Sequence, residues 1–232
     1  MPKNAKIPSP AVQPFAKLIE RLAQDIQTGR IKGLFVTGTD TDVGKTYISA
    51  TLLKALKQQL PHHHITARKP IASGCTQCDQ NDEIVCEDAL QLCQALDGET
   101  PLKLLNPYRF IPAVAPTLAL QQAGRNITTQ DLAQACQSKA DFTLIEGAGG
   151  FLSPISRDGL NKDLAQALGY PILLVVKDQL GCVNHTLLTQ SAIQAANLPL
   201  YATLLNFYAP QNKNAELMIQ FGVDRLFTAE EV

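Results

Sequence analysis

A nine-residue stretch between an apolar run and a helical pattern constrains this chain more than any other feature. Residues 38–46 read GTDTDVGKT, which is the pattern G-x-x-x-x-G-K-[ST] with one extra residue between the two glycines; we call them the phosphate loop. Backbone N–H groups of such a loop form an anion nest, and the N-terminus of the following helix adds positive character. Lys45 is predicted to reach the β- and γ-phosphates of a nucleotide, and the Thr46 hydroxyl to bind Mg²⁺.

Apolar runs alternate with helical patterns along the chain, whose 232 residues are 45% hydrophobic. Strands are predicted at 31–37, 64–68, 142–146, 171–176 and 200–205, and helices at 11–28, 47–60, 82–97, 117–124, 128–138, 160–169, 183–197 and 212–221. Unbroken apolar strands between helices imply a doubly wound, mostly parallel α/β sheet with helices on both faces, of the P-loop NTPase type. We expect one domain at 31–232, preceded by an N-terminal extension, residues 1–30, with one helix.

Composition narrows the function classes. Basic and acidic residues nearly balance, 20 against 21, which disfavours a nucleic-acid binder. Every apolar run is shorter than the roughly 18 residues that cross a membrane, and the first residues lack the apolar centre of a secretory signal. Six cysteines without such a signal disfavour a disulfide framework. We expect a cytoplasmic protein with no membrane partner.

Two charged residues are predicted to meet the phosphate loop at one edge of the sheet. Glu146 ends the run FTLIE and is followed by the glycine-rich residues 147–150, which let the backbone pass close to a ligand. Lys69 follows the short strand that ends at Arg68. Ligands collect at the carboxyl ends of parallel strands, so Glu146 is a candidate for the metal and Lys69 for a transferring phosphoryl group. The alternatives are a strand-terminal acid and a solvated lysine.

The same motifs occur in order in a known family. The string FVTGTDTDVGKT (35–46) resembles the phosphate loop of dethiobiotin synthetases, and ARKPIASG (67–74), EDALQL (87–92), NPYRF (106–110), EGAGG (146–150), LGCVNH (180–185) and LN (205–206) agree with it. The resemblance implies an ATP- and Mg²⁺-dependent ligase that joins CO₂ to 7,8-diaminononanoate. The reaction would pass through a carbamate and a carbamic–phosphoric anhydride, close a cyclic urea, and release ADP and phosphate.

The resemblance also implies roles for individual residues. The catalytic residues would be Lys69, beside the carbamate and the transferring phosphoryl group, and Lys45. The ATP-binding residues would be Asp42, Val43, Gly44, Lys45, Thr46, Tyr47, Asp88, Glu146, Gly147, Ala148, Gly149 and Asn206, the last at the adenine edge. The Mg²⁺ ligands would be Thr46, Asp88 and Glu146.

The diamine substrate would contact residues from both subunits of a homodimer, since members of the family are homodimers with the site at the subunit interface. Its diamine end would meet Thr41, Lys69, Ser73 and Gly149. Its carboxylate would lie at a helix N-terminus of the partner subunit, which maps here to Leu180, Gly181, Cys182, Val183 and Asn184. Free N–H groups at the start of the predicted helix 183–197 would attract a carboxylate.

The chain departs from the family pattern at its two ends. An extension of 30 residues is unusual for the family, and the sequence assigns it no role. The family often has a later Pro-Trp-Leu-type loop that contacts the nucleotide base, whereas this chain ends at FTAEEV and contains no tryptophan. We therefore expect looser discrimination among nucleoside triphosphates.

The remaining clusters of cysteines, acidic residues and histidines give weaker signals for a site. The spacing of Cys75, Cys78, Cys86 and Cys93 matches no common zinc pattern, and we interpret the last two as one helical face in the core. Asp79, Asp82 and Glu83 compete with Asp88 for the metal role, and the match to EDALQL favours Asp88. His62, His63 and His64 are expected in a solvated turn, and His185 in a structural hydrogen bond.

The residues also leave two other functions open. Another P-loop ATP-dependent synthetase of the amidating type would need a glutamine-hydrolysing partner domain. A nucleotide-switched ATPase of the partitioning type usually has a lysine just after the first glycine of the loop, where this chain has Thr39. The retained Lys45, Lys69 and Glu146 argue against an inactive relative.

Overall fold

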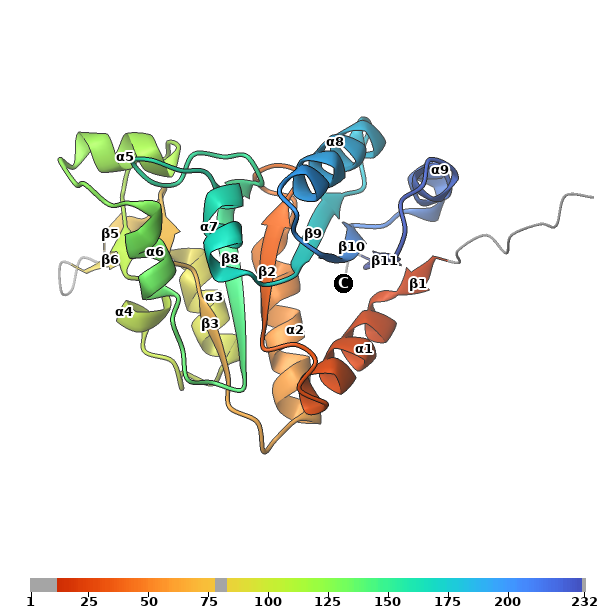
Figure 1. The fold of residues 1–232 in the computed structure, drawn as a ribbon, viewed down its shortest axis with the longest axis horizontal. Coiled ribbons are helices and arrows are strands. Elements are labelled where there is room, and N and C mark those ends of the chain that lie inside the picture. Colours follow the sequence, from red (N-terminus) through yellow and green to blue (C-terminus); the bar gives the residue numbers. More distant parts are fainter. Residues whose placement is uncertain (1–11, 78–82, 231–232) are drawn as a thin grey trace, which may run out of the picture.

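A seven-stranded parallel sheet forms the centre of the structure, a computed structural model that describes residues 12–77 and 83–230 (Figure 1). The strand order is β1-β11-β10-β9-β2-β8-β3, and every neighbouring pair is parallel. The strands are β1 (Gln13–Pro14), β2 (Gly33–Gly38), β3 (Ile65–Arg68), β8 (Phe142–Gly150), β9 (Ile172–Lys177), β10 (Leu200–Asn206) and β11 (Leu226–Thr228). The predicted doubly wound α/β fold is confirmed.

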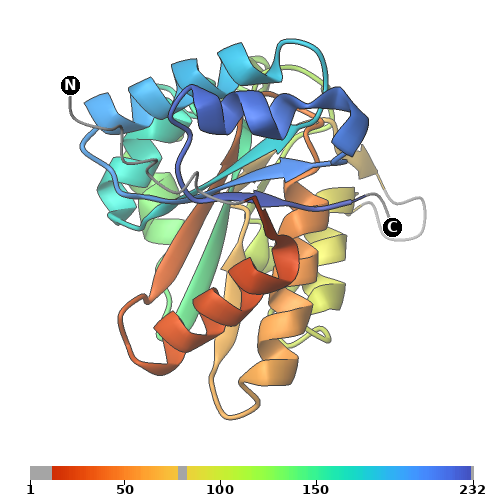
Figure 2. The same cartoon turned by 90° about the vertical axis from the view of Figure 1, so that its right-hand side faces the viewer.

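Helices cover both faces of this sheet (Figure 2). One layer contains α1 (Phe15–Gln27), α2 (Lys45–Gln59), α3 (Glu87–Ala95) and α4 (Leu102–Leu105), and the other contains α5 (Pro116–Gln122), α6 (Thr129–Ala135), α7 (Asn161–Leu168), α8 (Cys182–Ala195) and α9 (Asn214–Gln220). Successive strand residues point to opposite layers: Leu34 and Val36 join the first core, and Phe35 joins the second. Strands buried on both faces explain the unbroken apolar runs. Within the described residues, no helix is long and apolar enough to cross a membrane.

The described part of the N-terminal segment packs into the main body. Strand β1 pairs with β11 and forms one edge of the sheet, and Leu18 and Leu22 of α1 are fully buried in the first core. Asp25 of α1 accepts a hydrogen bond from the Tyr201 hydroxyl at 2.9 Å. The helix begins at Phe15, four residues later than expected, directly after Pro14, which lacks the N–H that a preceding helical turn needs.

Several elements differ from the sequence prediction. The expected helix 82–97 begins only at Glu87, because Ile84–Val85 form β6, which pairs with β5 (Thr76–Gln77). Strand β8 runs on through Gly150, where a loop was expected. The short strands β4 (Ile71–Ala72) and β7 (Tyr108–Arg109) pair with each other and carried no sequence signal. Asp79 and Asp82, expected as competitors for the metal role, lie outside the described residues.

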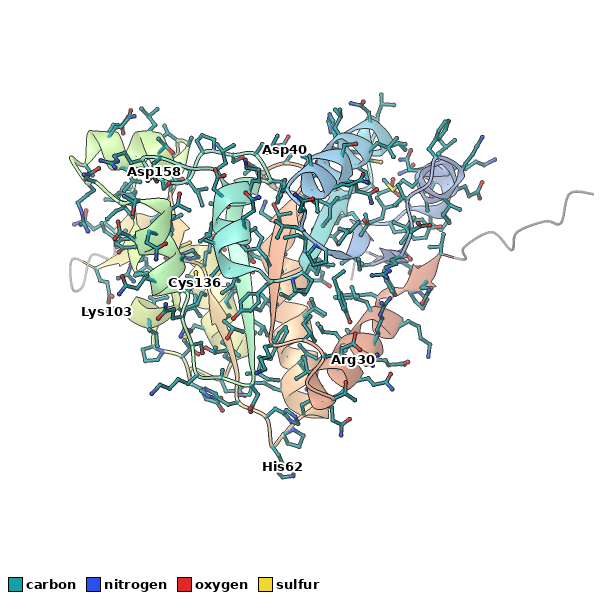
Figure 3. The ribbon with its side chains drawn as sticks, viewed as in Figure 1. Arg30, Asp40, His62, Lys103, Cys136 and Asp158 are labelled. Carbon is teal, nitrogen blue, oxygen red and sulfur yellow. The ribbon has the colours of Figure 1, made fainter. Side chains whose placement is uncertain are left out.

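The predicted histidine turn lies far from the phosphate loop. His62 is exposed in the turn between α2 and β3, at the end of the molecule opposite Asp40 (Figure 3). This agrees with the prediction of a solvated turn.

Candidate active site

Three adjacent strands bring the site together at their carboxyl ends. In the sheet, β2 and β3 flank β8, with Val36 in register with Glu146 and Arg68 in register with Ile145. The phosphate loop follows β2, Lys69 follows β3, and Glu146 lies within β8. A cavity of about 640 Å³ opens beside them.

Glycine is required at position 44 of the phosphate loop. Gly44 caps the N-terminus of α2 with φ +86°, a left-handed conformation that other residues adopt at a cost. A Cβ there would also collide with the Asn206 side-chain amide. That amide donates a 3.0 Å hydrogen bond to the Val43 carbonyl, so Asn206 supports the loop from beneath.

A buried lysine occupies the centre of the site. Lys69 Nζ lies 2.6 Å from Glu146 Oε1 and 2.7 Å from Asp88 Oδ2, and the Thr46 hydroxyl donates to the same Glu146 oxygen at 2.7 Å. Burial by itself lowers the pKa of Lys69, but Glu146 and Asp88 more than offset it, so this pKa is raised. Lys69 therefore stays charged throughout the physiological range.

The second lysine of the site folds back on its own loop. Lys45 Nζ donates a 2.9 Å hydrogen bond to the Asp40 carbonyl. Burial lowers the pKa of Lys45, the nearby Glu146 opposes this shift, and Lys69 adds to it. Lys45 is thus a buried cation whose loss of hydration the nearby carboxylates do not fully offset, and an anion bound beside it would favour its charged form. We call Lys45, Thr46, Lys69, Asp88 and Glu146 the charged cluster.

The two carboxylates of the charged cluster differ in exposure. Asp88 stands on the first turn of α3 with its side chain 47% exposed. Burial acts to raise the pKa of Asp88, but Lys69 and the Thr46 hydroxyl lower it overall. Glu146 is fully buried, and its Oε2 has no hydrogen-bond partner among the described residues. An orphaned carboxylate oxygen beside a threonine hydroxyl and a second carboxylate fits the oxygen-only preference of Mg²⁺.

Small, uncharged residues line much of the remaining cavity. Thr41, Ser73 and Gly149, the residues expected at the diamine end, lie here together with Ala148. Six further lining residues form what we call the small-residue wall: Ala72, Ala113, Val114, Ala115, Pro116 and Pro154. The wall was missed from the sequence. The Ser73 hydroxyl donates to the Val114 carbonyl at 2.6 Å, and Gly74 N–H donates to the Pro112 carbonyl at 3.0 Å, which folds residues 112–116 over the site.

Comparison with known proteins identifies the family. A family described as "AAA domain" matches residues 32–228. The ATP-dependent dethiobiotin synthetase BioD of Ruthia magnifica is 38% identical over 82% of this chain and 87% of its own length, and that of Pseudomonas paraeruginosa is 41% identical over 83% and 84%. The chain belongs to the dethiobiotin synthetase family.

Solved structures of lower identity share the fold alone. A ParA family ATPase from Chlorobium tepidum superimposes with a TM-score of 0.51 at 14% identity, over 87% of this chain and 85% of the other. The MinC:MinD cell division complex of Aquifex aeolicus gives 0.53 at 11% identity, over 87% and 82%. These likenesses show that the parallel sheet covered by helices on both faces is a fold shared with these proteins.

Some predicted site residues lie outside the cavity of this single chain. Val43, Glu146, Gly147 and Asn206 do not line it. Glu146 is fully buried behind Lys69, and Asn206 is buried with its Oδ1 unpaired among the described residues. Residues 180–184 lie at the start of α8, where Gly181 is the N-cap residue and Leu180 is 99% exposed. Gln91, one turn after Asp88 on α3, and Ser153 also line the cavity. Gln91 lies within EDALQL, but the sequence analysis took only Asp88 from that motif, and Ser153 lies in no motif.

Proposed function

We propose that this protein catalyses ATP-dependent dethiobiotin synthesis: it joins CO₂ to 7,8-diaminononanoate and closes the cyclic urea with release of ADP and phosphate. The observation that carries the proposal is the buried Lys69, held between Glu146 and Asp88 next to the phosphate loop. The family relation supplies the substrate. The enzyme is a ligase that forms C–N bonds.

The nucleotide would bind along the phosphate loop. Backbone N–H groups of residues 42–47 would hold the triphosphate, with residues 146–149 alongside it, and the Lys45 ammonium would leave the Asp40 carbonyl for the phosphates. Thr46, Asp88 and Glu146 would hold Mg²⁺, which supplies positive charge to the β- and γ-phosphates. Asn206 would contact the adenine edge.

For this reaction the protein mainly has to position the substrates and supply compensating charge. One substrate amine takes up CO₂ to form a carbamate, whose oxygen accepts the γ-phosphoryl group of ATP; the second amine then attacks the carbamate carbon and phosphate leaves. The carbamate and the triphosphate repel each other at reacting distance. Lys69 would bind both anions and Lys45 the phosphates, so that the two reacting groups approach.

The diamine would lie against Thr41, Ser73 and Gly149. A homodimer would complete the site, with the N-terminus of the partner's α8 at residues 180–184 binding the substrate carboxylate. The strongly exposed Leu180 fits such a contact. We place the enzyme in the cytoplasm.

A phosphate-release assay with ATP, Mg²⁺, bicarbonate and the diamine tests the function. Release should require the diamine and be accompanied by dethiobiotin, detected by mass spectrometry. An equal rate of phosphate release with and without the diamine would instead indicate a nucleotide-switched ATPase and would reject the proposal.

A further inference from the structure

Two cysteines face each other beside the charged cluster. In the β5–β6 ladder, Thr76 is opposite Val85 and Gln77 is opposite Ile84. One step further along, Cys75 is opposite Cys86. Opposed residues of an antiparallel pair have Cα atoms about 4.5–5.5 Å apart, within the range of roughly 4.4–6.8 Å that a disulfide spans.

The two thiols already interact. Cys75 and Cys86 are buried, and a hydrogen bond joins their side chains. Each is anchored to a different part of the fold. The Cys75 N–H donates to the Phe110 carbonyl at 3.0 Å, whereas Cys86 is the residue directly before α3. Cys86 therefore does not share a helical face with Cys93, as the sequence interpretation had it, although both pack in the first core as expected.

We infer that Cys75 and Cys86 form a reversible disulfide that inactivates the enzyme. A low-molecular-weight disulfide, such as oxidised glutathione, is the oxidant. One cysteine thiolate attacks it and releases one small thiol, and the second cysteine then displaces the other, so two protons and two electrons pass to the oxidant's sulfurs. The β5–β6 pair has two residues in each strand, and so small a hairpin opens locally to admit the reagent.

The position of Cys86 couples this bond to the active site. Bonded sulfurs lie about 2.05 Å apart, closer than hydrogen-bonded ones, so oxidation draws the start of α3 toward Cys75. Asp88, two residues on, then shifts relative to Lys69, which it contacts at 2.7 Å in the reduced protein. The expected loss of turnover rests on the proposed function, in which Lys69 and Asp88 act in the active site. Formation of the disulfide does not rest on that function.

Mass spectrometry tests the bond independently of activity. The folded protein is incubated with oxidised glutathione, its remaining thiols are alkylated after denaturation, and peptides are analysed. A cross-linked peptide joining Cys75 to Cys86, reversed by dithiothreitol, is expected. Alkylation of both cysteines after oxidation, or pairing of either with Cys78, would overturn the inference, as would zinc in the purified protein that is lost from C75S.

Activity measurements test the switch. Oxidation should lower diamine-dependent phosphate release at least fivefold in the wild type, with full recovery on reduction. C75S and C86S should keep wild-type activity within twofold and resist oxidation. C93S removes another thiol of α3, whose sulfur donates to the Thr100 carbonyl, and should remain sensitive. A cross-linked protein of unchanged activity would overturn the inference. Loss of activity in C75S and C86S variants that melt at the wild-type temperature would also overturn it. If the serine variants melt at a lower temperature, C75A and C86A are measured in their place.

Discussion

The charged cluster and the small-residue wall meet in one cavity but are encoded differently. The cluster takes its residues from strand ends and from the first turns of α2 and α3, each within a recognisable motif. The wall comes from residues 72, 113–116 and 154, to which the sequence assigned no role in the site. The wall forms because β4 pairs with β7. Ile71 of β4 is in register with Tyr108 of β7, and these two residues are 37 positions apart in the sequence. Chemistry is therefore locally encoded here, whereas the shape of the substrate space depends on distant pairing.

Substitution of Lys69 tests the cluster most strongly. Lys69→Ala should lower turnover about 100- to 1,000-fold, because one charge that stabilises the transition state is removed, while a fluorescent ATP analogue still binds. Lys57→Ala is the matched control, since Lys57 also pairs with two carboxylates, Asp97 and Glu99, but at the far end of α2. A near-normal rate in Lys69→Ala would mean that the cluster is structural.

Two glycine substitutions separate backbone strain from site geometry. Gly44→Ala should weaken ATP binding at least tenfold, because its Cβ meets the Asn206 amide. Gly98 has a similar φ, +76°, but no described atom lies within 4 Å of a Cβ built there. Gly98→Ala should only lower stability, by about 1–2 kcal/mol. Isothermal titration with ATP and urea unfolding measure the two effects; equal ATP affinities in the two variants would contradict the loop assignment.

The wall should control the diamine and leave the nucleotide unaffected. Ala115→Leu adds bulk to the cavity lining and should raise KM for the diamine roughly tenfold, since misplaced methylene groups in a pocket are worth about 1–3 kcal/mol. ATP affinity should stay the same. Ala123→Leu, exposed at the end of α5, is the control. A change in ATP affinity alone would reverse the roles given to the two regions.

The smallest expected effect concerns pH. The pKa of Asp88 is lowered in the folded protein, so its ion pair stabilises the fold above the unfolded pKa of about 3.9. That contribution disappears as the pH falls through the lower, folded value. In urea unfolding, Asp88→Asn should therefore be less stable than the wild type at pH 7, and the difference should shrink by pH 3. A constant difference would show that Asp88 acts through packing.

The sequence by itself determined the doubly wound fold, the phosphate loop and the residue types of the charged cluster. Periodicity and strand-end position report local structure, and parallel strands bring their carboxyl ends to one edge. Only the tertiary structure decided that Lys69 lies between Glu146 and Asp88, that β1 pairs with β11, and that residues 113–116 cover the site. These contacts join segments far apart in the chain, and their geometry depends on packing that no local pattern encodes.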